Sequence, residues 1–541
     1  MAANLGKPPP RGAKPQRHIK SSSPAPIGGL NVRDAINAMP AGDAVRLTNW
    51  IPQEYGVRTR KGWKEWATNL GAPVRTVMKY HPNHENFISY RLFAATDDKI
   101  FDVTAATNNP PTAVTLTGGD GYGVMSSVMM SNIAGNYLLT CSNKGGYRYY
   151  NGTTWTKPLK GPGSGGTIDG VDPDLFVFVT TWKRRVWFIE KGSTRAWYLA
   201  TNAITGPATM FDFGPLLPHG GALVFIAAWS IDAGEGIDDI LCVAAENGDI
   251  LIYKGTNPDS VTDFGLVGRF YIGGMPRGGR NFESMGGDLL ILSEMGLQPL
   301  SYVTRGGQSM LRVGSTDYLG KIQPKLTELM SAGIFDQGWQ LKLYPRDNLF
   351  FVQLPRSAFP TFEQYVLYTN TNTWTKFEGV PISCSEVALN QFWFGTEDGR
   401  VCLGMTGFFD NVKLNESVGS GIRGVIQPVF SYFGMPGGNK QFLMARPTFI
   451  ATDTPTYTLY MLIDFKEPIP GGAAISKDSE GSKWDISNWD ESYWTGGMQT
   501  FQRWVGTAGV GYTGAVYMES TCVGDTFLAS IDYLYEPGGP W

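Results

Sequence analysis

The 541-residue sequence predicts an all-β protein with a β-propeller of six or seven blades, a second, sandwich-like β platform domain and an extended N-terminal arm. Three observations support this expectation. The chain contains 68 glycines and 34 prolines, 13 % of its residues are aromatic, and only 17 % are charged, against roughly 25 % in an average soluble chain. Short apolar runs alternate with tight turns at a regular interval. After residue 411 the pattern changes to longer alternating segments.

The N-terminal arm, residues 1–28, is rich in proline and basic, and it contains no acidic residue. Such a composition predicts a segment that is extended and disordered on its own. We expect the positive charges of the arm to dock onto an acidic surface of a partner protein. The residues expected to make this contact are Lys7, Arg11, Lys14, Arg17 and Lys20.

Charge and cysteine usage exclude several classes of function. With 45 basic and 48 acidic residues the net charge is −3, which is the wrong balance for a protein that grips duplex DNA through its phosphates. The five cysteines are scattered without C-x-x-C spacing, so we expect neither disulfides nor a zinc site, and a reducing cytoplasm as the folding compartment. No apolar run approaches the ~20 residues of a membrane span, and the N-terminus lacks the apolar core of a signal peptide. We therefore expect no membrane anchor.

The propeller is expected between residues 71 and 410, after a segment, 29–70, that leads into the platform domain. Apolar runs such as RRVWFIE (184–190) end in turns rich in Asn, Asp and Gly, which tolerate positive φ. Successive turn centres are about 50 residues apart, which is the period expected for four-stranded blades. These centres lie at residues 98, 145, 192, 248, 296, 347 and 399.

Two local patterns add detail to the propeller. YYNGTTW (149–155) resembles YTNTNTW (368–374), which favours equivalent turns in two blades, with two unrelated turns before a tryptophan as the alternative. Residues 319–334 carry apolar side chains at helical spacing and predict one helix inserted between blades. Those side chains are Leu319, Ile322, Leu326, Leu329 and Met330.

The platform domain is expected over residues 411–541, where segments such as YTLYMLI (457–463) alternate in hydrophobicity. GVGYTG (509–514) matches the G-x-G-x-x-G pattern of dinucleotide sites, but no βαβ unit follows it, so we expect a turn. Trp484, Trp489 and Trp494 recur every five residues. They predict packing or subunit contacts, with an aromatic sugar-binding platform as the alternative.

An ordered series of short motifs spans residues 28–63. It consists of Gly28-Gly29, Asn31 to Asp34, Met39-Pro40, Asp43-Ala44, Asn49-Trp50, Arg60 and Gly62. In this order the motifs resemble the opening of podovirus tail nozzle and tail hub proteins, structural proteins of short-tailed bacteriophages related to packaged-DNA stabilisation. Further stretches carry the resemblance over nearly the whole chain. They are WKRRVWFI (182–189), YKGTNP (253–258), GDLLIL (287–292), the Trp484-Asp485 and Trp489-Asp490 pair, and Glu536 to Gly539.

The resemblance implies a virion protein that is synthesised in the cytoplasm of the host bacterium. It implies a hexameric ring below the portal and adaptor, with the propellers outside and the platform domains lining a channel. This ring would retain packaged DNA and conduct it during ejection, without sequence-specific binding. Adaptor and tail fibre proteins are the partners that it implies.

None of the motifs is catalytic, so we expect no enzyme and no catalytic, cofactor-binding or metal-binding residue. One alternative is a glycan-binding or glycan-cleaving tail propeller, although the repeated Ser-x-Asp-x-Gly-x-x-Trp boxes of sialidases are absent. Another is a bacterial extracellular kelch-like binding protein, against which the missing signal peptide counts.

Overall fold

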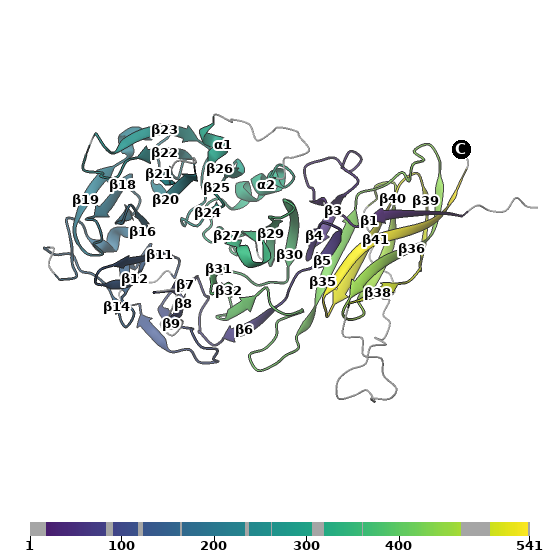
Figure 1. The fold of residues 1–541 in the computed structure, drawn as a ribbon, viewed down its shortest axis with the longest axis horizontal. Coiled ribbons are helices and arrows are strands. Elements are labelled where there is room, and N and C mark those ends of the chain that lie inside the picture. Colours follow the sequence, from purple (N-terminus) through teal and green to yellow (C-terminus); the bar gives the residue numbers. More distant parts are fainter. Residues whose placement is uncertain are drawn as a thin grey trace, which may run out of the picture.

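A computed structural model describes residues 18–82, 90–116, 123–162, 165–232, 237–260, 262–305, 319–359, 361–466 and 498–538. These residues form two β units that lie next to each other, a propeller and a sandwich (Figure 1). The described helices are the short α1 (Leu300–Thr304) and α2 (Gln323–Gly333). The structure therefore confirms the all-β class and the propeller with a second β domain.

Seven sheets surround the axis of the propeller (Figure 1). Six have at least four strands and form complete blades, and one has three strands and is followed by α1. In chain order, the first blade consists of β7 (Thr76–Tyr80), β8 (Arg91–Ala95), β9 (Lys99–Asp102) and β10 (Thr112–Thr115). The second consists of β11 (Met125–Asn132), β12 (Gly135–Ser142), β13 (Gly146–Tyr150) and β14 (Trp155–Thr156). The third consists of β15 (Ile168–Asp169), β16 (Phe176–Trp182), β17 (Arg185–Glu190), β18 (Arg195–Leu199) and β19 (Gly206–Asp212). The next two are β20 (Leu223–Asp232), β21 (Ile237–Ala245), β22 (Asp249–Lys254) and β23 (Gly265–Tyr271), then the three-stranded β24 (Phe282–Met285), β25 (Asp288–Ser293) and β26 (Gly296–Pro299). The last two are β27 (Gln340–Tyr344), β28 (Leu349–Gln353), β29 (Glu363–Tyr368) and β30 (Thr373–Glu378), then β31 (Cys384–Ala388), β32 (Gln391–Gly395), β33 (Val401–Gly404) and β6 (Trp63–Ala67).

The last blade closes the ring with a strand from the N-terminal part of the chain. β6 pairs with β33 in antiparallel register, from Trp63 opposite Gly404 to Ala67 opposite Val401. The propeller therefore begins at residue 63, and the predicted start at residue 71 is wrong. A ring of sheets is closed only when both ends of the repeat meet in one blade, and a sequence period does not show which distant strand does so.

The turns bear out most of the predicted period. Five of the seven predicted centres lie at the turn between the second and third strands of a sheet. Residue 192 lies between the third and fourth strands of the five-stranded sheet, β17 and β18, and residue 347 lies between the first and second strands, β27 and β28. The two similar motifs occupy equivalent turns, because 149–155 joins β13 to β14 and 368–374 joins β29 to β30. The predicted helix is confirmed as α2, which lies between β26 and β27 and buries Leu326 and Met330.

The sandwich consists of two packed sheets. One contains β1 (Ile19–Pro24), β4 (Trp50–Gln53), β5 (Gly56–Thr59), β36 (Lys440–Ala451), β38 (Gln499–Gln502), β39 (Val505–Gly511) and β41 (Thr526–Pro537). The other contains β3 (Asp43–Thr48), β35 (Ser420–Pro428), β37 (Thr456–Ile463) and β40 (Gly514–Cys522), with β2 (Gly29–Leu30) beside β3 and β34 (Phe409–Asp410) beside β35. Trp50, Phe449 and Met518 are buried in the core that these sheets share.

The sandwich is discontinuous in sequence, which corrects the predicted platform of residues 411–541. Residues 19–59 supply five of its strands, β1 to β5. The predicted disorder of the arm is also wrong for its last residues, since β1 pairs with β41 from Ile19 opposite Tyr535 to Pro24 opposite Ser530. Without β1, the backbone groups along this edge of β41 would be unpaired. Their hydrogen bonds hold β1 in place, although its own side chains contribute little to folding.

The propeller and the sandwich share a sheet. Blade strand β30 lies beside β3, with Thr48 opposite Lys376, and β3 continues into β35, β40 and β37. Figure 1 shows β3, β4, β5 and β35 between the two units. The N-terminal segment is therefore placed at the junction of the two units.

Candidate functional site

A buried arginine connects the two units at this junction. The side chain of Arg60 is fully buried. Its Nη1 and Nη2 donate to the two carboxylate oxygens of Asp410 at 2.7 and 2.6 Å, and its Nε donates to Asn49 Oδ1 at 2.8 Å. We refer to Asn49, Arg60 and Asp410 as the Arg60 cluster. A two-pronged arginine–carboxylate pair of this kind fixes both distance and orientation.

Asn49 extends the Arg60 cluster into both units. Its Nδ2 donates to the backbone carbonyls of Glu378 in the blade and Arg423 in the sandwich, at 3.1 and 2.7 Å. The backbone N–H of Glu378 donates back to Asn49 Oδ1 at 2.9 Å. Asn49 has a φ of 61°, a left-handed conformation that asparagine tolerates better than most residues. One side chain therefore satisfies backbone groups of β30 and β35 together.

A second cluster joins residues 28–43 to Lys321, which lies just before α2. Lys321 Nζ lies 2.8 Å from Asp43 Oδ1 and donates to the carbonyl of Gly28 at 3.0 Å. Asn31 Nδ2 donates to Asp43 Oδ2 and to Asp34 Oδ2, both at 2.8 Å. We call these residues, Asn31, Asp34, Asp43 and Lys321, the Asp43 cluster. A hydrogen bond from Arg33 holds the pKa of Asp34 below its ordinary value.

The glycines of the same segment lie where two backbones touch. A Cβ on Gly62 would stand 1.8 Å from the carbonyl oxygen of Phe409, and one on Gly28 would stand 2.1 Å from Asp43 Oδ1. Gly29 has a φ of +77°, and its Cβ would stand 2.8 Å from the carbonyl oxygen of Trp374. The Gly, Asn, Asp and Arg motifs of residues 28–63 thus share one structural use, which is to fasten the propeller to the sandwich.

Replacing Gly62 by alanine should destabilise the protein by about 3 kcal/mol or more, because the added methyl group forces β34 away from the start of β6. The measurement is urea unfolding followed by tryptophan fluorescence. Gly437→Ala is the matched control, since a Cβ there meets nothing within 4 Å, and we expect it to change stability by less than ~0.5 kcal/mol. Equal stabilities of the two variants would contradict the close approach at Gly62.

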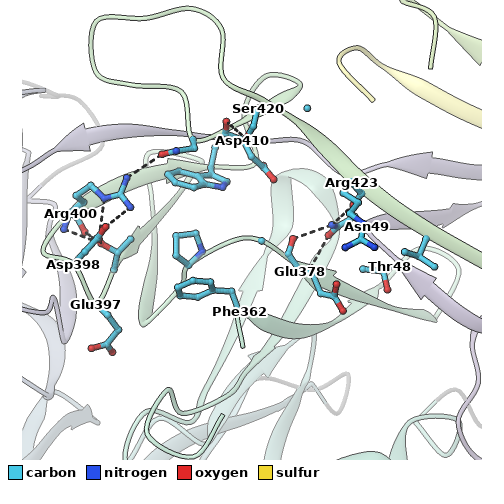
Figure 2. Close-up of a pocket in the computed structure, with 17 residues that line it drawn as sticks. Thr48, Asn49, Phe362, Glu378, Glu397, Asp398, Arg400, Asp410, Ser420 and Arg423 are labelled. Atoms are coloured by element: carbon cyan, nitrogen blue, oxygen red, sulfur yellow. Dashed lines mark hydrogen bonds and ion pairs between the residues drawn. The ribbon is translucent and has the colours of Figure 1, made fainter. Parts of the chain in front are cut away.

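A cavity of about 580 Å³ opens at the same junction (Figure 2). We call it the junction groove. The acids that line it already have cationic partners. Asp398 lies 2.6 Å from Arg400, Glu397 lies 3.0 Å from Arg75, and Asp410 belongs to the Arg60 cluster. These carboxylates of the groove are therefore held in ion pairs with neighbouring side chains.

Arg400 anchors the side of the groove that belongs to the propeller. Its Nη1 lies 2.8 Å from Glu65 Oε1, and its guanidinium lies 5.6 Å from the centre of the Trp63 ring. Burial alone would raise the pKa of Glu65, but hydrogen bonds from Lys413 and Arg400 lower it below its usual range. These contacts fix β6, the strand that closes the ring.

A third polar cluster lies on the axis of the propeller. Lys342 Nζ lies 3.2 Å from Glu386 and 3.8 Å from Glu283, and Lys79 Nζ lies 2.9 Å from Glu386. We call these four residues the axial charge cluster. Burial would raise the pKa of Glu386, but Lys342 and Lys79 lower it to about 2. The axial cavity beside them measures only about 180 Å³, so side chains occupy the axis of a single propeller.

The predicted docking residues lie elsewhere. Lys7, Arg11, Lys14 and Arg17 fall outside the described residues. Lys20 lies in β1, with Nζ 5.9 Å from the centre of the Trp504 ring, so it belongs to the sandwich rather than to a free arm. The Trp484, Trp489 and Trp494 loop also lies outside the described residues. The G-x-G-x-x-G match falls at the end of β39 and the start of β40, as predicted for a turn.

Within the described ranges, no group of three His, Cys, Asp or Glu side chains could hold a metal ion. No described helix is long and apolar enough to cross a membrane. All five cysteines are buried thiols, and burial raises the pKa of Cys522 to about 11. Sequence reasoning identified the motifs of residues 28–63 by resemblance but missed their role. The available signal was the combination of glycines with Asn, Asp and Arg, which is typical of tightly packed turns.

Comparisons with known proteins add the following findings. No protein-family model matches the chain, and no curated protein matches it. Among solved structures, the chain is similar to Raptor of Chaetomium thermophilum, with 12 % identity over 64 % of this chain and 28 % of that one and a TM-score of 0.36. It is similar to the β-propeller domain of Cps50 (Swd1) of Myceliophteria thermophila, with 11 % identity over 61 % of this chain and 100 % of that one and a TM-score of 0.32. It is also similar to BBS1N in complex with ARL6DN, with 13 % identity over 43 % of this chain and 66 % of that one and a TM-score of 0.27. At these identities the likeness concerns the fold alone, which the strand order of the chain itself establishes.

Proposed function

We propose that the chain is a structural subunit of a short-tailed phage tail, in the nozzle or hub. Six copies form a closed ring below the portal and adaptor, which continues the DNA channel, retains packaged DNA and conducts it during ejection. The observation that supports this most is the shared use of the motifs in residues 28–63. The residues that carry the resemblance form the Arg60 and Asp43 clusters, which make one block of two units.

A block of this kind suits a ring that must hold DNA back, because force on one unit passes to the other. The sheet that runs from β27 through β30 and β3 to β37 gives such a path through backbone hydrogen bonds. The Arg60 cluster adds a buried link beside it. Mechanical continuity of this sort is what a structural subunit requires.

The filled axis of the propeller favours a conduit formed between copies. DNA cannot follow an axis in which Lys342, Glu386 and Glu283 are in contact. A channel along the symmetry axis of a ring, with the sandwiches as its wall, meets no such obstacle. Two arginines on the sandwich are ion-paired, Arg423 with Glu519 at 3.0 Å and Arg446 with Asp532 at 2.5 Å. Paired arginines hold a sliding phosphate polymer less tightly than free ones do.

Electron microscopy of particles that carry the protein tests this function. We expect six copies in a closed ring between the adaptor and the lower end of the tail, with the propellers outside. A monomer or a fibre at the host-facing tip would contradict the proposal. Free chains in solution are a separate matter, because a heterologous interface can need a template before the ring closes.

Deleting residues 2–17 should leave a folded chain with an unchanged melting temperature but should prevent attachment of tails to heads, because the arm is the proposed anchor. Deleting residues 2–24 should instead lower the melting temperature, since it also removes β1 from β41. The measurements are differential scanning calorimetry and the yield of infectious particles. Normal yield with the 2–17 deletion would show that the arm is not an anchor.

A further inference from the structure

A further cavity lies at one end of the propeller axis. It measures about 750 Å³ and is lined by residues from the blade turns at Asp97, Lys144 and Glu397, together with Arg280 and Arg356. Those three turns join second strands to third strands, so the cavity opens on the face that carries these turns. Arg280 also lines the axial cavity, so the two spaces adjoin. We call the larger one the axial mouth.

Arg280 lines the axial mouth and makes no ion pair within the described residues. Its guanidinium donates to the backbone carbonyls of Arg75 and Met125, at 3.0 and 2.9 Å, and to the hydroxyl of Thr76. All three acceptors are neutral. The charge of Glu386 acts on it only from beyond ion-pair distance, and burial lowers the pKa of Arg280.

Arg356 lies in the wall of the same cavity and also makes no ion pair within the described residues, although the charge of Glu397 acts on it at longer range. Its guanidinium stacks 3.9 Å from the centre of the Phe362 ring, and Nη1 donates to the carbonyl of Phe359 at 3.1 Å. Its Nε is buried and has no hydrogen-bond partner in the part of the chain that the structure describes. Burial lowers the pKa of this arginine too.

Other arginines near this region show the contrast. Arg60 and Arg400 each contact a carboxylate at 2.6 Å. Arg75, which lines the axial mouth, forms ion pairs with both Asp97 and Glu397, at 3.3 and 3.0 Å. Two acids of the cavity, Asp97 and Glu397, are thus already paired with Arg75. A partly buried cation without a partner is unfavourable, and two in one cavity leave a positive site that an anion would complete.

We propose that the axial mouth binds an acidic side chain on a loop of a partner protein, with Arg280 and Arg356 as the donors to its carboxylate. The planar fork of arginine matches a carboxylate geometrically. This site does not depend on the tail assignment, because it rests only on the charges and shape of the cavity.

The other wall residues favour a peptide over a nucleic acid. Asp336 lines the same cavity and would repel a chain of phosphates, whereas a peptide brings one carboxylate to the two arginines. Phe335, which is 74 % exposed, gives apolar contact at the cavity wall. The volume is also large for a single small anion and falls within the range of sites that hold several groups.

The test is isothermal titration calorimetry on the full chain with two blocked peptides, acetyl-Gly-Phe-Glu-Gly-amide and its Gln counterpart, at constant ionic strength. We expect saturable binding of the Glu peptide and at least about tenfold weaker binding of the Gln peptide. Arg356→Met should weaken binding of the Glu peptide about tenfold or more. The control Arg195→Met, which removes an arginine that is paired with Glu190 outside the cavity, should leave it unchanged.

Three results would overturn the proposal. They are equal binding of the two peptides, unchanged binding to Arg356→Met, and saturable binding of inorganic phosphate that exceeds that of the Glu peptide and is lost in Arg356→Met. The last result would assign the site to phosphate. If Arg356→Met does not fold, Arg356→Gln and Arg280→Lys carry the same comparison, the first removing the charge and the second keeping it without the fork.

Discussion

Arg60→Met is expected to destabilise the protein by about 3–5 kcal/mol at neutral pH, because it leaves the carboxylate of Asp410 without its cationic donor and removes one of the two donors to the carbonyl of Glu378. The measurement is urea unfolding followed by both tryptophan fluorescence and circular dichroism. We further expect the single transition of the wild type to separate into two, since the link between propeller and sandwich is lost.

The double-mutant cycle with Asp410→Asn isolates this pair. We expect Arg60→Met with Asp410→Asn to be less destabilised than the sum of the single variants, because the charge that Arg60 neutralises is then absent. Arg423→Met is the matched control, since the side chain of Arg423 is 66 % exposed and pairs with Glu519 near the surface, and such pairs contribute about 1 kcal/mol or less. A loss at Arg60 no larger than that at Arg423 would contradict the assigned role of the Arg60 cluster.

Lys342→Met should cost about 3–5 kcal/mol at pH 7, because Glu386 and Glu283 then remain buried without their shared cation. The pH dependence has a defined sign. The folded pKa of Glu386 is about 2, below its ordinary 4.5, so its contribution is present above pH ~4.5 and is lost as the pH falls toward 2. Burial raises the pKa of Glu283, so this group opposes stability at pH values above its folded pKa.

In Lys342→Met both carboxyl groups should protonate more readily in the folded state. The difference in stability between wild type and variant should therefore narrow as the pH falls from 7 toward 4. Unfolding in urea at several pH values measures it, with Lys325→Met as control, because Lys325 pairs with the exposed Glu328 on α2. A difference that is constant with pH would show that packing, not charge, accounts for the loss.

The turns of the propeller could be predicted because each is encoded by a few adjacent residues. Asn247-Gly248 and Asp398-Gly399 specify tight turns by themselves. The turn at residue 347 has the same composition but joins a different pair of strands, since local chemistry does not state the place of a turn within a blade. In that blade the second and third strands, β28 and β29, are joined by residues 354–362.

The closing strand and the polar clusters could not be predicted in this way. Trp63–Ala67 pairs with Val401–Gly404, and Arg60 meets Asp410 across 350 positions. The residues adjacent in sequence to each of these elements do not indicate which distant strand or side chain it will contact. The arginines of the axial mouth come from two connections, before β24 and after β28, and only the folded ring places them in one cavity. The motifs of residues 28–63 stand out in the sequence, and the structure shows their contacts at the junction.

The pairing of early strands with late ones has a consequence for synthesis. β6 leaves the ribosome roughly 20–70 seconds before its partner β33 at elongation rates of about 5–20 residues per second. β1 waits longer still for β41. During that interval the blades can fold one after another, but the ring stays open and the edges of β1 and β5 remain unpaired. Polysomes would bring many such edges close together, a situation that favours pairing between chains. Pro24 at the end of β1 removes a backbone donor, so the strand that waits longest is a poorer template for an incoming chain.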